Sequence, residues 1–455
     1  MLRRISILAS ILIICTLCLA VEPKEIVENG GWCWFQDERA IFEDGDTLLL
    51  GSVKTPSGDI DASSWNLKTG ETKTHTLSKD FNCDDHAAPA FLKLSNGEVL
   101  AVWSSHGNAK NKENNGTLFY AKKRAGDSVD SWGATKTLKH GGCYNNLYQL
   151  ESENGKIYNF VRSVGWNPNY HTSVDMGETF PYGGRFLFWK ASKDDPKATG
   201  LDGNRPYVKY ASDGKDKIHF ISTESHPRAY DNSLYHGYLK QGKMFDSQGG
   251  EVGALSKSSK SLLKPSDFTK IFDGDAQNVA WGVDLNIDKR GNPVCIFSVQ
   301  KNAGHLRKLH SHLGADLRYY YAIFDGKKWH VNQMAFAGTS IYTNPKFYSE
   351  PDYSALAAIV PHSPDTVYIS TNSNPQTGEP LVSAADGMRH FEIFKGKTSD
   401  MGKTWTWTAV TKDSKFDNIR PIVPISPDSK TVVLWLRGSY TTYCDYNTSV
   451  VGIVD

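Results

Sequence analysis

The sequence predicts an all-β fold, a seven-bladed β-propeller made of four-stranded antiparallel blades. Two observations predict it. Seven pairs of apolar runs are each joined by a short polar turn, and these turns recur 52 to 77 residues apart along the 455-residue chain. A repeat of this length, with about four strands per unit, is typical of a propeller blade. Two other segments share the pattern of the Asp-box, a hairpin turn found in blades.

Each repeat reads as an apolar run, a turn and a second apolar run, which is the signature of a β-hairpin. The turns lie near Gly45, Gly97, Gly155, Gly214, Gly291, Asp365 and Asp428. The polar segment 247–267, rich in Ser and Lys, is expected to be an excursion between the fourth and fifth blades. The last run, TSVVGIVD, reads as a strand without a hairpin partner. We expect it to complete a blade with residues near the mature N-terminus, which closes the ring and removes a sheet edge.

The two Asp-boxes are Ser173–Phe180 (SVDMGETF) and Thr398–Trp405 (TSDMGKTW). In this motif the Asp side chain binds backbone amides of the turn and the final aromatic residue fills the blade. The predicted role is structural.

Composition limits the classes of partner. Lys and Arg number 51 and Asp and Glu 50, so the basic excess of a nucleic-acid-binding protein is absent. The aromatic content of 12% and the 39 glycines suit a β-rich protein with many turns. Aromatic rings also suit sugar binding, although most are expected in the core. We expect a monomer with no nucleic-acid or membrane partner.

The N-terminus reads as an export signal. Two arginines precede an apolar run that ends near Ala20, too short for a stable transmembrane helix. We therefore divide the chain into a signal peptide, residues 1–20, and one propeller domain, residues 21–455, and expect a secreted or periplasmic protein. Five cysteines would remain in the mature chain. Cys83 and Cys143 each precede a hairpin; a disulfide between them and a pair of thiols both fit the sequence.

The second and third hairpins hold the candidate catalytic residues. His86 and His106 lie at the two ends of the second hairpin, and an antiparallel hairpin brings its ends together. Tyr144 begins the third hairpin, eleven residues before its turn glycine, as His86 does in the second, and Arg162 ends it. Blade four places three further candidates at the same face, for substrate binding: Arg205, His226 and Arg228.

This set is cationic and poor in carboxylates, since only Glu224 and Asp84/Asp85 fall near it. A glycoside hydrolase needs a carboxylate pair, which the set does not show. It fits β-elimination at a uronic acid, in which an arginine neutralises the sugar carboxylate, a base removes the C5 proton and an acid protonates the leaving oxygen. Histidine and tyrosine suit either proton-transfer role. The structural alternative stays open: each histidine, Tyr144 or Arg162 could serve packing or a blade-edge ion pair.

Metal ligands are not indicated. His226 and His236 lie ten residues apart, and His305, His310 and His312 cluster in a basic segment, but neither group has the short fixed spacing of a zinc site. We expect no metal in the catalytic site and no required cofactor. The sequence leaves room for a structural calcium or zinc ion.

Three long stretches resemble the BNR-repeat-containing propeller family: NGGWCWFQDERAIF, RPYVKYASDGKDKIHF with the SHPR and NSLYHGY segments after it, and DNIRPIVP with the C-terminal VVLWLRGSYTTYCDYNTSVVG. Within that family the chain looks most like seven-bladed ulvan lyases, which cleave between 3-sulfated rhamnose and glucuronic or iduronic acid. The resemblance implies a His, His, Tyr, Arg set on adjacent blades, matched here by His86, His106, Tyr144 and Arg162. Some of the similar lyases carry a structural zinc ion held by His and Cys. In this chain the matching histidines would be His226 and His236, but no cysteine lies beside them in the sequence.

The sequence therefore predicts an exported polysaccharide lyase acting by β-elimination on an acidic, ulvan-like polysaccharide. Either His86 or Tyr144 is the base and the other the acid; Arg162 neutralises the carboxylate and His106 supports it. Two alternatives remain. An α-L-rhamnosidase-like hydrolase of the same fold would release rhamnose without forming a double bond. A non-catalytic glycan-binding propeller would bind without turnover. A sialidase is disfavoured because FQDERAIF is not the FRIP-type motif of that class.

Overall fold

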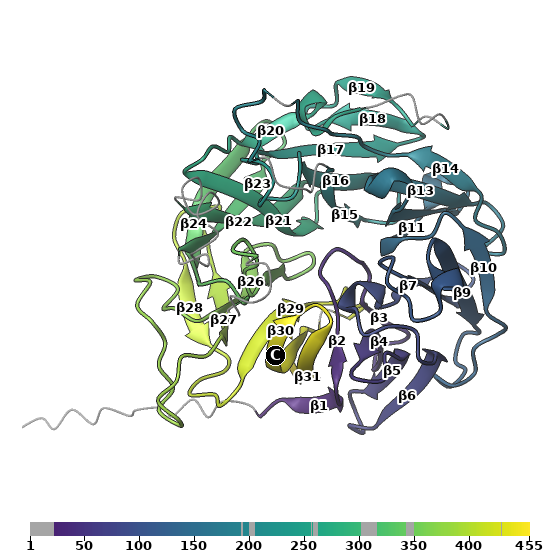
Figure 1. The fold of residues 1–455 in the computed structure, drawn as a ribbon, viewed down its shortest axis with the longest axis horizontal. Coiled ribbons are helices and arrows are strands. Elements are labelled where there is room, and N and C mark those ends of the chain that lie inside the picture. Colours follow the sequence, from purple (N-terminus) through teal and green to yellow (C-terminus); the bar gives the residue numbers. More distant parts are fainter. Residues whose placement is uncertain are drawn as a thin grey trace, which may run out of the picture.

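In the computed structural model, seven antiparallel sheets follow one another around a ring (Figure 1). The structure describes residues 22–192, 194–199, 205–255, 257, 263–301, 316–342, 350–428 and 430–455. The predicted fold, seven blades of four antiparallel strands, is confirmed. The expected signal peptide, residues 1–20, and the histidines at 305, 310 and 312 lie outside the described residues.

The second and third blades, which follow blade one in the ring, carry the predicted catalytic residues. Blade one contains β2 (Gly30–Gly31), β3 (Ala40–Phe42), β4 (Thr47–Lys54), β5 (Ile60–Asn66) and β6 (Thr72–Ser78). Blade two contains β7 (Ala90–Lys93), β8 (Val99–Ser104), β9 (Thr117–Lys123) and β10 (Lys136–Lys139). Blade three contains β11 (Cys143–Leu150), β12 (Lys156–Arg162), β13 (Pro168–Ser173) and β14 (Tyr182–Arg185).

Blades four to six continue the ring. Blade four contains β15 (Tyr207–Ser212), β16 (Ile218–Thr223), β17 (Leu234–Lys240), β18 (Lys243–Asp246), β19 (Glu251–Ala254) and β20 (Thr269–Phe272). Blade five contains β21 (Asn278–Ile287), β22 (Pro293–Lys301), β23 (Leu317–Phe324) and β24 (Trp329–Gly338). Blade six contains β25 (Ala357–Ile359), β26 (Thr366–Thr371), β27 (Glu392–Lys397) and β28 (Thr406–Ala409). The expectation for 247–267 is wrong in one respect: β19, which lies within this segment, belongs to the sheet of blade four because it pairs with β18.

Blade seven closes the ring. It contains β29 (Asp417–Ile422), β30 (Val432–Thr442), β31 (Asp445–Val454) and, from the other end of the chain, β1 (Lys24–Val27). The closure by N-terminal residues is confirmed, since Lys24 pairs with Gly452. The last strand does have a hairpin partner, contrary to expectation, because β31 pairs with β30 along its length. Pairing on both sides removes the open edge that the last strand would otherwise present.

All seven predicted turns join the innermost paired strands of their blades. In the third, Asn154 (φ 56°) and Gly155 (φ 72°) both adopt the left-handed conformation that Asn-Gly hairpin turns favour. Both Asp-boxes form as expected. In the first, Asp175 Oδ1 accepts from the backbone N–H of Thr179 at 3.0 Å, and Phe180 is buried. In the second, Asp400 Oδ1 accepts from Thr404 N at 3.0 Å.

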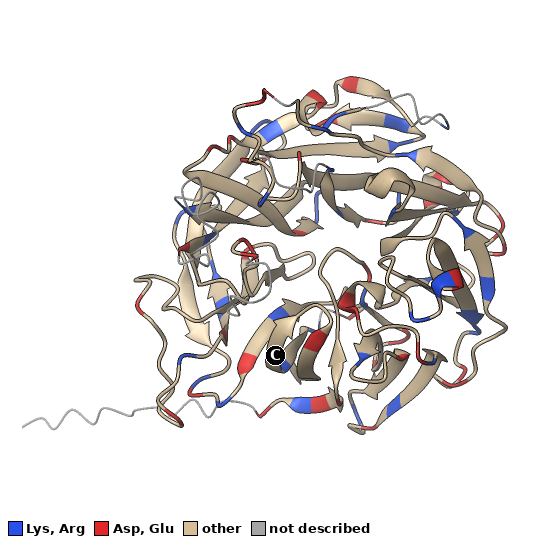
Figure 2. Cartoon of the chain, viewed as in Figure 1, with Lys and Arg blue, Asp and Glu red and all other residues tan. Residues whose placement is uncertain are grey.

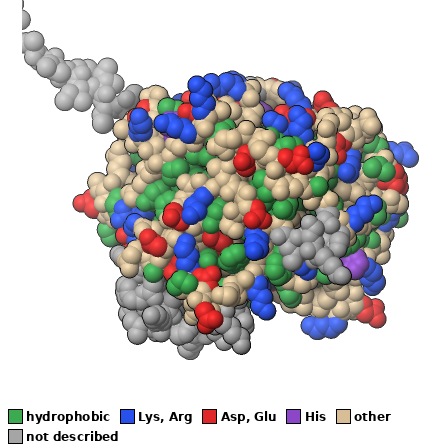
Figure 3. Space-filling view, turned by 90° about the horizontal axis from the view of Figure 1, so that it is seen from above, with side chains coloured by type: hydrophobic (Ala, Val, Ile, Leu, Met, Phe, Trp, Pro, Cys, Tyr) green, Lys and Arg blue, Asp and Glu red, His purple; other side chains and the backbone are tan. Residues whose placement is uncertain are grey.

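Apolar residues of the strands form the core between neighbouring blades, with Trp32, Trp103 and Trp435 fully buried. Basic and acidic side chains are both spread around the ring (Figure 2) and are interspersed on the face seen in Figure 3. The described helices are five single turns: η1 (Asp85–Ala87), η2 (Lys112–Asn114), η3 (Glu151–Glu153), η4 (Val164–Trp166) and η5 (Pro265–Asp267). None of the helices in this part of the chain has the length and apolar character needed to span a bilayer.

Candidate functional site

The hairpin of blade two brings its histidines together. His86 lies in η1, just before β7, and His106 follows the end of β8. Their rings stack with centroids 4.2 Å apart and planes at 7°. The prediction that the hairpin ends make His86 and His106 neighbours is therefore confirmed.

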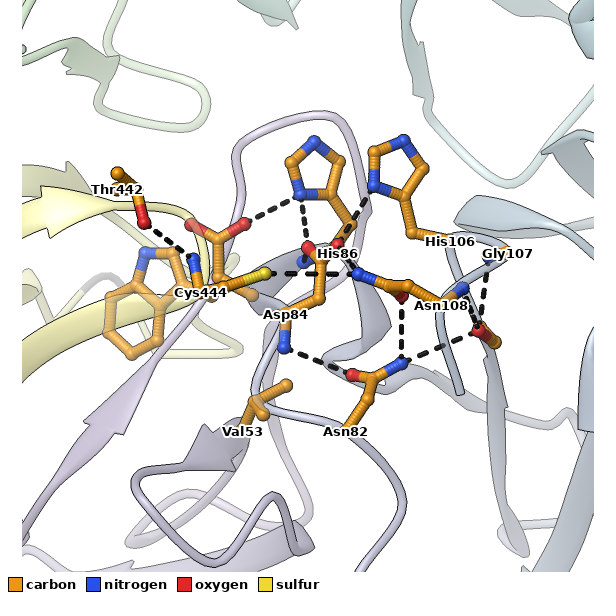
Figure 4. Close-up of polar contacts among 12 residues, drawn as sticks. Val53, Asn82, Asp84, His86, His106, Gly107, Asn108, Thr442 and Cys444 are labelled. Atoms are coloured by element: carbon orange, nitrogen blue, oxygen red, sulfur yellow. Dashed lines mark hydrogen bonds and ion pairs between the residues drawn. The ribbon is translucent and has the colours of Figure 1, made fainter. Parts of the chain in front are cut away.

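Asp84 holds both rings. The Nδ1 of His86 donates to Asp84 Oδ1 at 2.7 Å, and the Nδ1 of His106 donates to Asp84 Oδ2 at 2.9 Å. Figure 4 shows the two imidazoles side by side, with the second nitrogen of each directed away from the carboxylate. A carboxylate at Nδ1 fixes the tautomer and leaves Nε2 for chemistry. Asp84 is thus the shared anchor of the pair, a role that the sequence analysis did not assign.

A β-bulge on the inner strand of blade three presents Tyr144. Cys143 pairs with Arg162 across the hairpin, and the register shifts between Cys143 and Asn146. Tyr144 lies within this shift and has φ 64°. A bulge redirects a side chain out of the regular alternation of the strand. It places the Tyr144 ring 5.1 Å from the ring of His86.

Arg162 completes the predicted set. Its Nη2 lies against His106 Nε2, its Nη1 donates to Tyr207 Oη at 3.1 Å, and its guanidinium carbon lies 4.3 Å from the centre of the Tyr144 ring. The side chain is buried, with 4% of its surface exposed. Among the described residues, Arg162 forms no ion pair with a carboxylate. The contacts given above for Arg162 are with neutral groups and rings of the described chain, an arrangement suited to an anionic ligand.

The local charges set opposite protonation states for the two histidines. Burial disfavours the charged form of His86, but Tyr144, Cys33, Asp84 and Asp85 raise its pKa well above the usual value. Burial, together with the charges of His86 and Arg162, lowers the pKa of His106 to about 4. At neutral pH the pair therefore consists of a protonated His86 and a neutral His106. Burial also keeps the pKa of Tyr144 well above its usual value, although Arg162 and His86 act to lower it.

Tyr207 is a site residue that the sequence analysis missed. It begins β15, two residues after Arg205, and its hydroxyl accepts from Arg162 and from Arg205 Nη2, the latter at 3.4 Å. Burial alone would raise the pKa of Tyr207, but Arg205, Arg162 and Arg228 together lower it below its usual value. The available signal was Arg205, a predicted substrate-binding residue that lies two positions before Tyr207 in the sequence.

The predicted substrate-binding residues divide into two groups. Arg205 adjoins the catalytic set, with its guanidinium carbon 5.7 Å from the centre of the Trp166 ring. Arg228 instead forms an ion pair with Glu350, and His226 Nε2 lies 3.5 Å from the same carboxylate. The set is therefore not as poor in carboxylates as the sequence suggested. Asp84 lies at its centre and Glu350, absent from the predicted set, offsets the charge of Arg228.

A second buried network supports His86 from blade seven. Asp85 Oδ1 lies 2.8 Å from His86 Nδ1, while Asp85 Oδ2 forms an ion pair with Arg420 and accepts from Tyr440 Oη at 2.7 Å. Arg420 sits in a bulge of β29 with φ 56°. Blade seven therefore fixes Asp85, which in turn adds negative charge beside His86.

Two groups of possible metal ligands occur among the described residues: Asp84, His86 and His106, and Cys33, Asp85 and His86. In each group the carboxylate already has partners within the protein, because Asp84 binds both histidines and Asp85 binds Arg420. These residues fit proton transfer better than metal binding. His236 contacts His219 and Ser247, whereas His226 contacts Trp281 and lies near Glu350.

The cysteines of the described chain are free thiols. Cys143 is buried, and burial raises the pKa of its thiol. The Sγ of Cys83 instead lies 3.1 Å from the carbonyl oxygen of Pro56. Of the two alternatives left by the sequence, the structure shows separate thiols.

Comparison with known proteins identifies relatives of the fold. Residues 50–337 match the model of the BNR repeat-containing family. Comparison with curated proteins finds no match. A solved PL25 ulvan lyase bound to -[GlcA(1-4)Rha3S]- is 16% identical, with 94% of this chain and 95% of that chain covered and a TM-score of 0.62. A second PL25 ulvan lyase structure is also 16% identical, with 94% of this chain and 95% of that chain covered and a TM-score of 0.63. Polysaccharide lyase Uly1 is 11% identical, with 95% and 98% covered and a TM-score of 0.53. At these identities the likeness shows the fold alone.

Proposed function

Since the chain belongs to the BNR repeat-containing family, we propose that it is a carbohydrate-active propeller enzyme, and specifically a polysaccharide lyase that cleaves a uronate-containing polysaccharide by β-elimination. One observation carries this proposal. The buried guanidinium of Arg162 has no carboxylate partner in the described chain and is surrounded by proton-transfer groups. A sugar carboxylate would supply the missing negative charge.

The reaction needs three roles in one place. Arg162 binds the uronate carboxylate and stabilises the negative charge that develops when C5 loses its proton. A base accepts that proton, a double bond forms between C4 and C5, and the bond from C4 to the leaving oxygen breaks. An acid then gives its proton to that oxygen.

His86 is the proposed base and Tyr144 the proposed acid. Both hold their protons in the free site, because the pKa of each is raised. His86 must lose its proton before it can act as the base, and because its pKa is raised, that loss requires a pH above its usual range. Burial holds the pKa of Tyr144 well above its usual value, so Tyr144 is the group assigned to keep its proton. Neutral His86 can then accept at Nε2 while Tyr144 still carries the proton for the leaving oxygen. We therefore expect kcat/KM to increase as the pH rises above neutrality. His106, held by Asp84 and Arg162, is a positioning residue.

The proposed substrate is an acidic, ulvan-like polysaccharide with uronate next to sulfated rhamnose. Two PL25 relatives of the fold are ulvan lyases, one of them with a bound glucuronate–rhamnose sulfate unit. Arg205, next to Tyr207, is available to bind a second anionic group of the polymer. The enzyme is proposed to act outside the cytoplasm after removal of residues 1–20 and to need no cofactor.

The test is a panel of ulvan, alginate and polygalacturonate, followed by the ultraviolet absorbance of the unsaturated product. Arg162→Ala should lower kcat/KM by about 100-fold or more, while Arg290→Ala, which removes an exposed arginine of blade five, should leave it unchanged. Release of reducing sugar without new absorbance would identify a hydrolase instead. Binding that survives His86→Ala, without turnover by the wild-type protein, would identify a glycan-binding propeller.

A further inference from the structure

Trp166 is a large apolar side chain exposed at the rim of the catalytic cluster. The indole is 48% exposed, and Val164 in the same turn is 37% exposed. Exposed apolar side chains that are grouped and surrounded by polar residues often mark binding sites, whereas single exposed ones are common on any protein surface. Trp103 and Trp435, in contrast, are completely buried in the blades.

The backbone holds this ring in place. Trp166 ends η4 with φ 61°, a conformation uncommon for a bulky residue, and its N–H donates to Ser163 O at 2.8 Å. Gly107 lies against the indole, where an added Cβ would come within 3.1 Å of the ring. The absence of a side chain at Gly107 therefore lets the ring pack beside the His106 loop while much of its surface faces solvent.

The neighbours of Trp166 all belong to the anion-binding side of the site. Its ring lies 5.9 Å from that of His106, at 83°, and the guanidinium carbons of Arg162 and Arg205 lie 5.6 Å and 5.7 Å from its centre. No ring contact joins Trp166 to His86 among the described residues, whereas Tyr443 contacts His86 at 5.3 Å. The indole thus lies beside the proposed carboxylate site and away from the proposed base.

We propose that Trp166 stacks against the sugar that adjoins the bound uronate, on the Arg205 side of the catalytic cluster. This inference rests on the proposed function and adds a substrate-binding residue to it. A pyranose presents C–H groups on one face and hydroxyls at its edge. The exposed indole offers the flat apolar surface for the C–H face, and Arg205 lies close enough to meet anionic or hydroxyl groups at the edge. Trp166 holds the polymer in register, while Arg162 holds the uronate itself.

The experiment compares Trp166→Ala, Trp166→Phe and Phe416→Ala with the wild-type protein, using ulvan in kinetic assays and in affinity electrophoresis. Phe416 is the matched control, since it is an aromatic residue 60% exposed at the start of blade seven. Trp166→Ala should raise KM about tenfold or more, with a much smaller change in kcat, because truncating a tryptophan anchor removes binding energy shared by substrate and transition state. Trp166→Phe should recover most of the loss, and Phe416→Ala should behave as wild type.

The outcomes separate this inference from the proposed function. The stacking role is supported if Trp166→Ala no longer shows gel retardation while its melting temperature equals that of the wild-type protein. This holds even if the wild-type protein forms no unsaturated product, and in that case the lyase proposal alone fails. Unsaturated product formed by Trp166→Ala with unchanged KM and retardation overturns the stacking role and leaves the lyase proposal standing. Failure of the wild-type protein to bind or cleave ulvan overturns the stacking role for this polymer.

Discussion

Substituting Asp84 by asparagine tests the electrostatic basis of the site. The Asp84 carboxylate is completely buried and accepts four hydrogen bonds, from the backbone N–H and Nδ1 of His86, from Nδ1 of His106 and from Asn108 Nδ2 (Figure 4). Asparagine keeps the size of the side chain but removes its charge and turns one acceptor into a donor. Each carboxylate oxygen accepts two of these bonds, so two of the donors that now point at Asp84 would face an N–H group.

The magnitude follows from the two imidazole contacts. A hydrogen bond to a charged group contributes about 1.5–3 kcal/mol. Losing both bonds would therefore remove about 3–6 kcal/mol of the interaction free energy that holds the two imidazoles in position. If the transition state bears that loss, kcat/KM falls by about 10² to 10⁴. The pKa of His86 should also fall, since Asp84 is one of the charges that raise it. The rising limb of the pH–rate profile should therefore move to lower pH.

The assay is the pH dependence of unsaturated-product formation by Asp84→Asn and by the control Asp61→Asn. Asp61 is also a buried carboxylate, but it lies in blade one and accepts from Thr76 at 2.7 Å. Thermal unfolding of both variants separates loss of fold from loss of function. An Asp84→Asn enzyme with an unshifted pH profile and a kcat/KM close to wild type would refute the reasoning.

Three further predictions follow from other parts of the molecule. Tyr207→Phe removes the hydroxyl that accepts from Arg162 and Arg205 and should lower kcat/KM about 10- to 100-fold without lowering the melting temperature much; full activity would remove Tyr207 from the site. Burial and the nearby charge of Asp37 raise the pKa of Glu38 to about 8 from its usual 4.5, so its stabilising contribution is complete below about pH 4.5 and is lost as the pH rises through about 8. The melting temperature should therefore fall between about pH 4.5 and 8, with a smaller slope in Glu38→Gln, and equal slopes in the two proteins would contradict this. Deleting residues 22–28 removes β1 and leaves one edge of β31 unpaired. The deletion variant should therefore have a lower melting temperature than the full chain and should aggregate more in light scattering, and equal values for the two proteins would contradict this.

The fold could be predicted from the sequence because its main signals are local. A turn such as Asn154-Gly155 needs only its own residues to adopt positive φ, and each Asp-box forms its hydrogen bonds within a few residues. The stacking of His86 and His106 was also accessible, since a hairpin determines where its own ends lie. Signals of this kind do not depend on how the blades pack.

The rest of the site depends on contacts between blades and on departures from regular pairing. Arg420 reaches Asp85 from a position 335 residues away, and no turn or spacing connects the two. Tyr207 reaches the predicted catalytic set through Arg162 and Tyr144, which belong to another blade. Glu350 reaches Arg228 across 122 residues. Hairpin register placed Tyr144 correctly at the start of its strand, but the bulge that aims its side chain cannot be read from spacing.

These bulges explain how a regular ring produces an irregular site. The inner strands of blades three and seven each contain a shift in register, and the side chains of Tyr144 and Arg420 leave the strands there with positive φ. A positive φ is unfavourable for residues other than glycine and persists only where the surrounding structure stabilises it. Here the neighbouring blades pack against Tyr144 and Arg420 and stabilise that conformation. One bulge aims a phenol at His86 and the other aims a guanidinium at Asp85, the carboxylate beside the same imidazole. The regular strands therefore account for the stability of the ring, whereas the proposed chemistry arises where two of those strands break their register around His86.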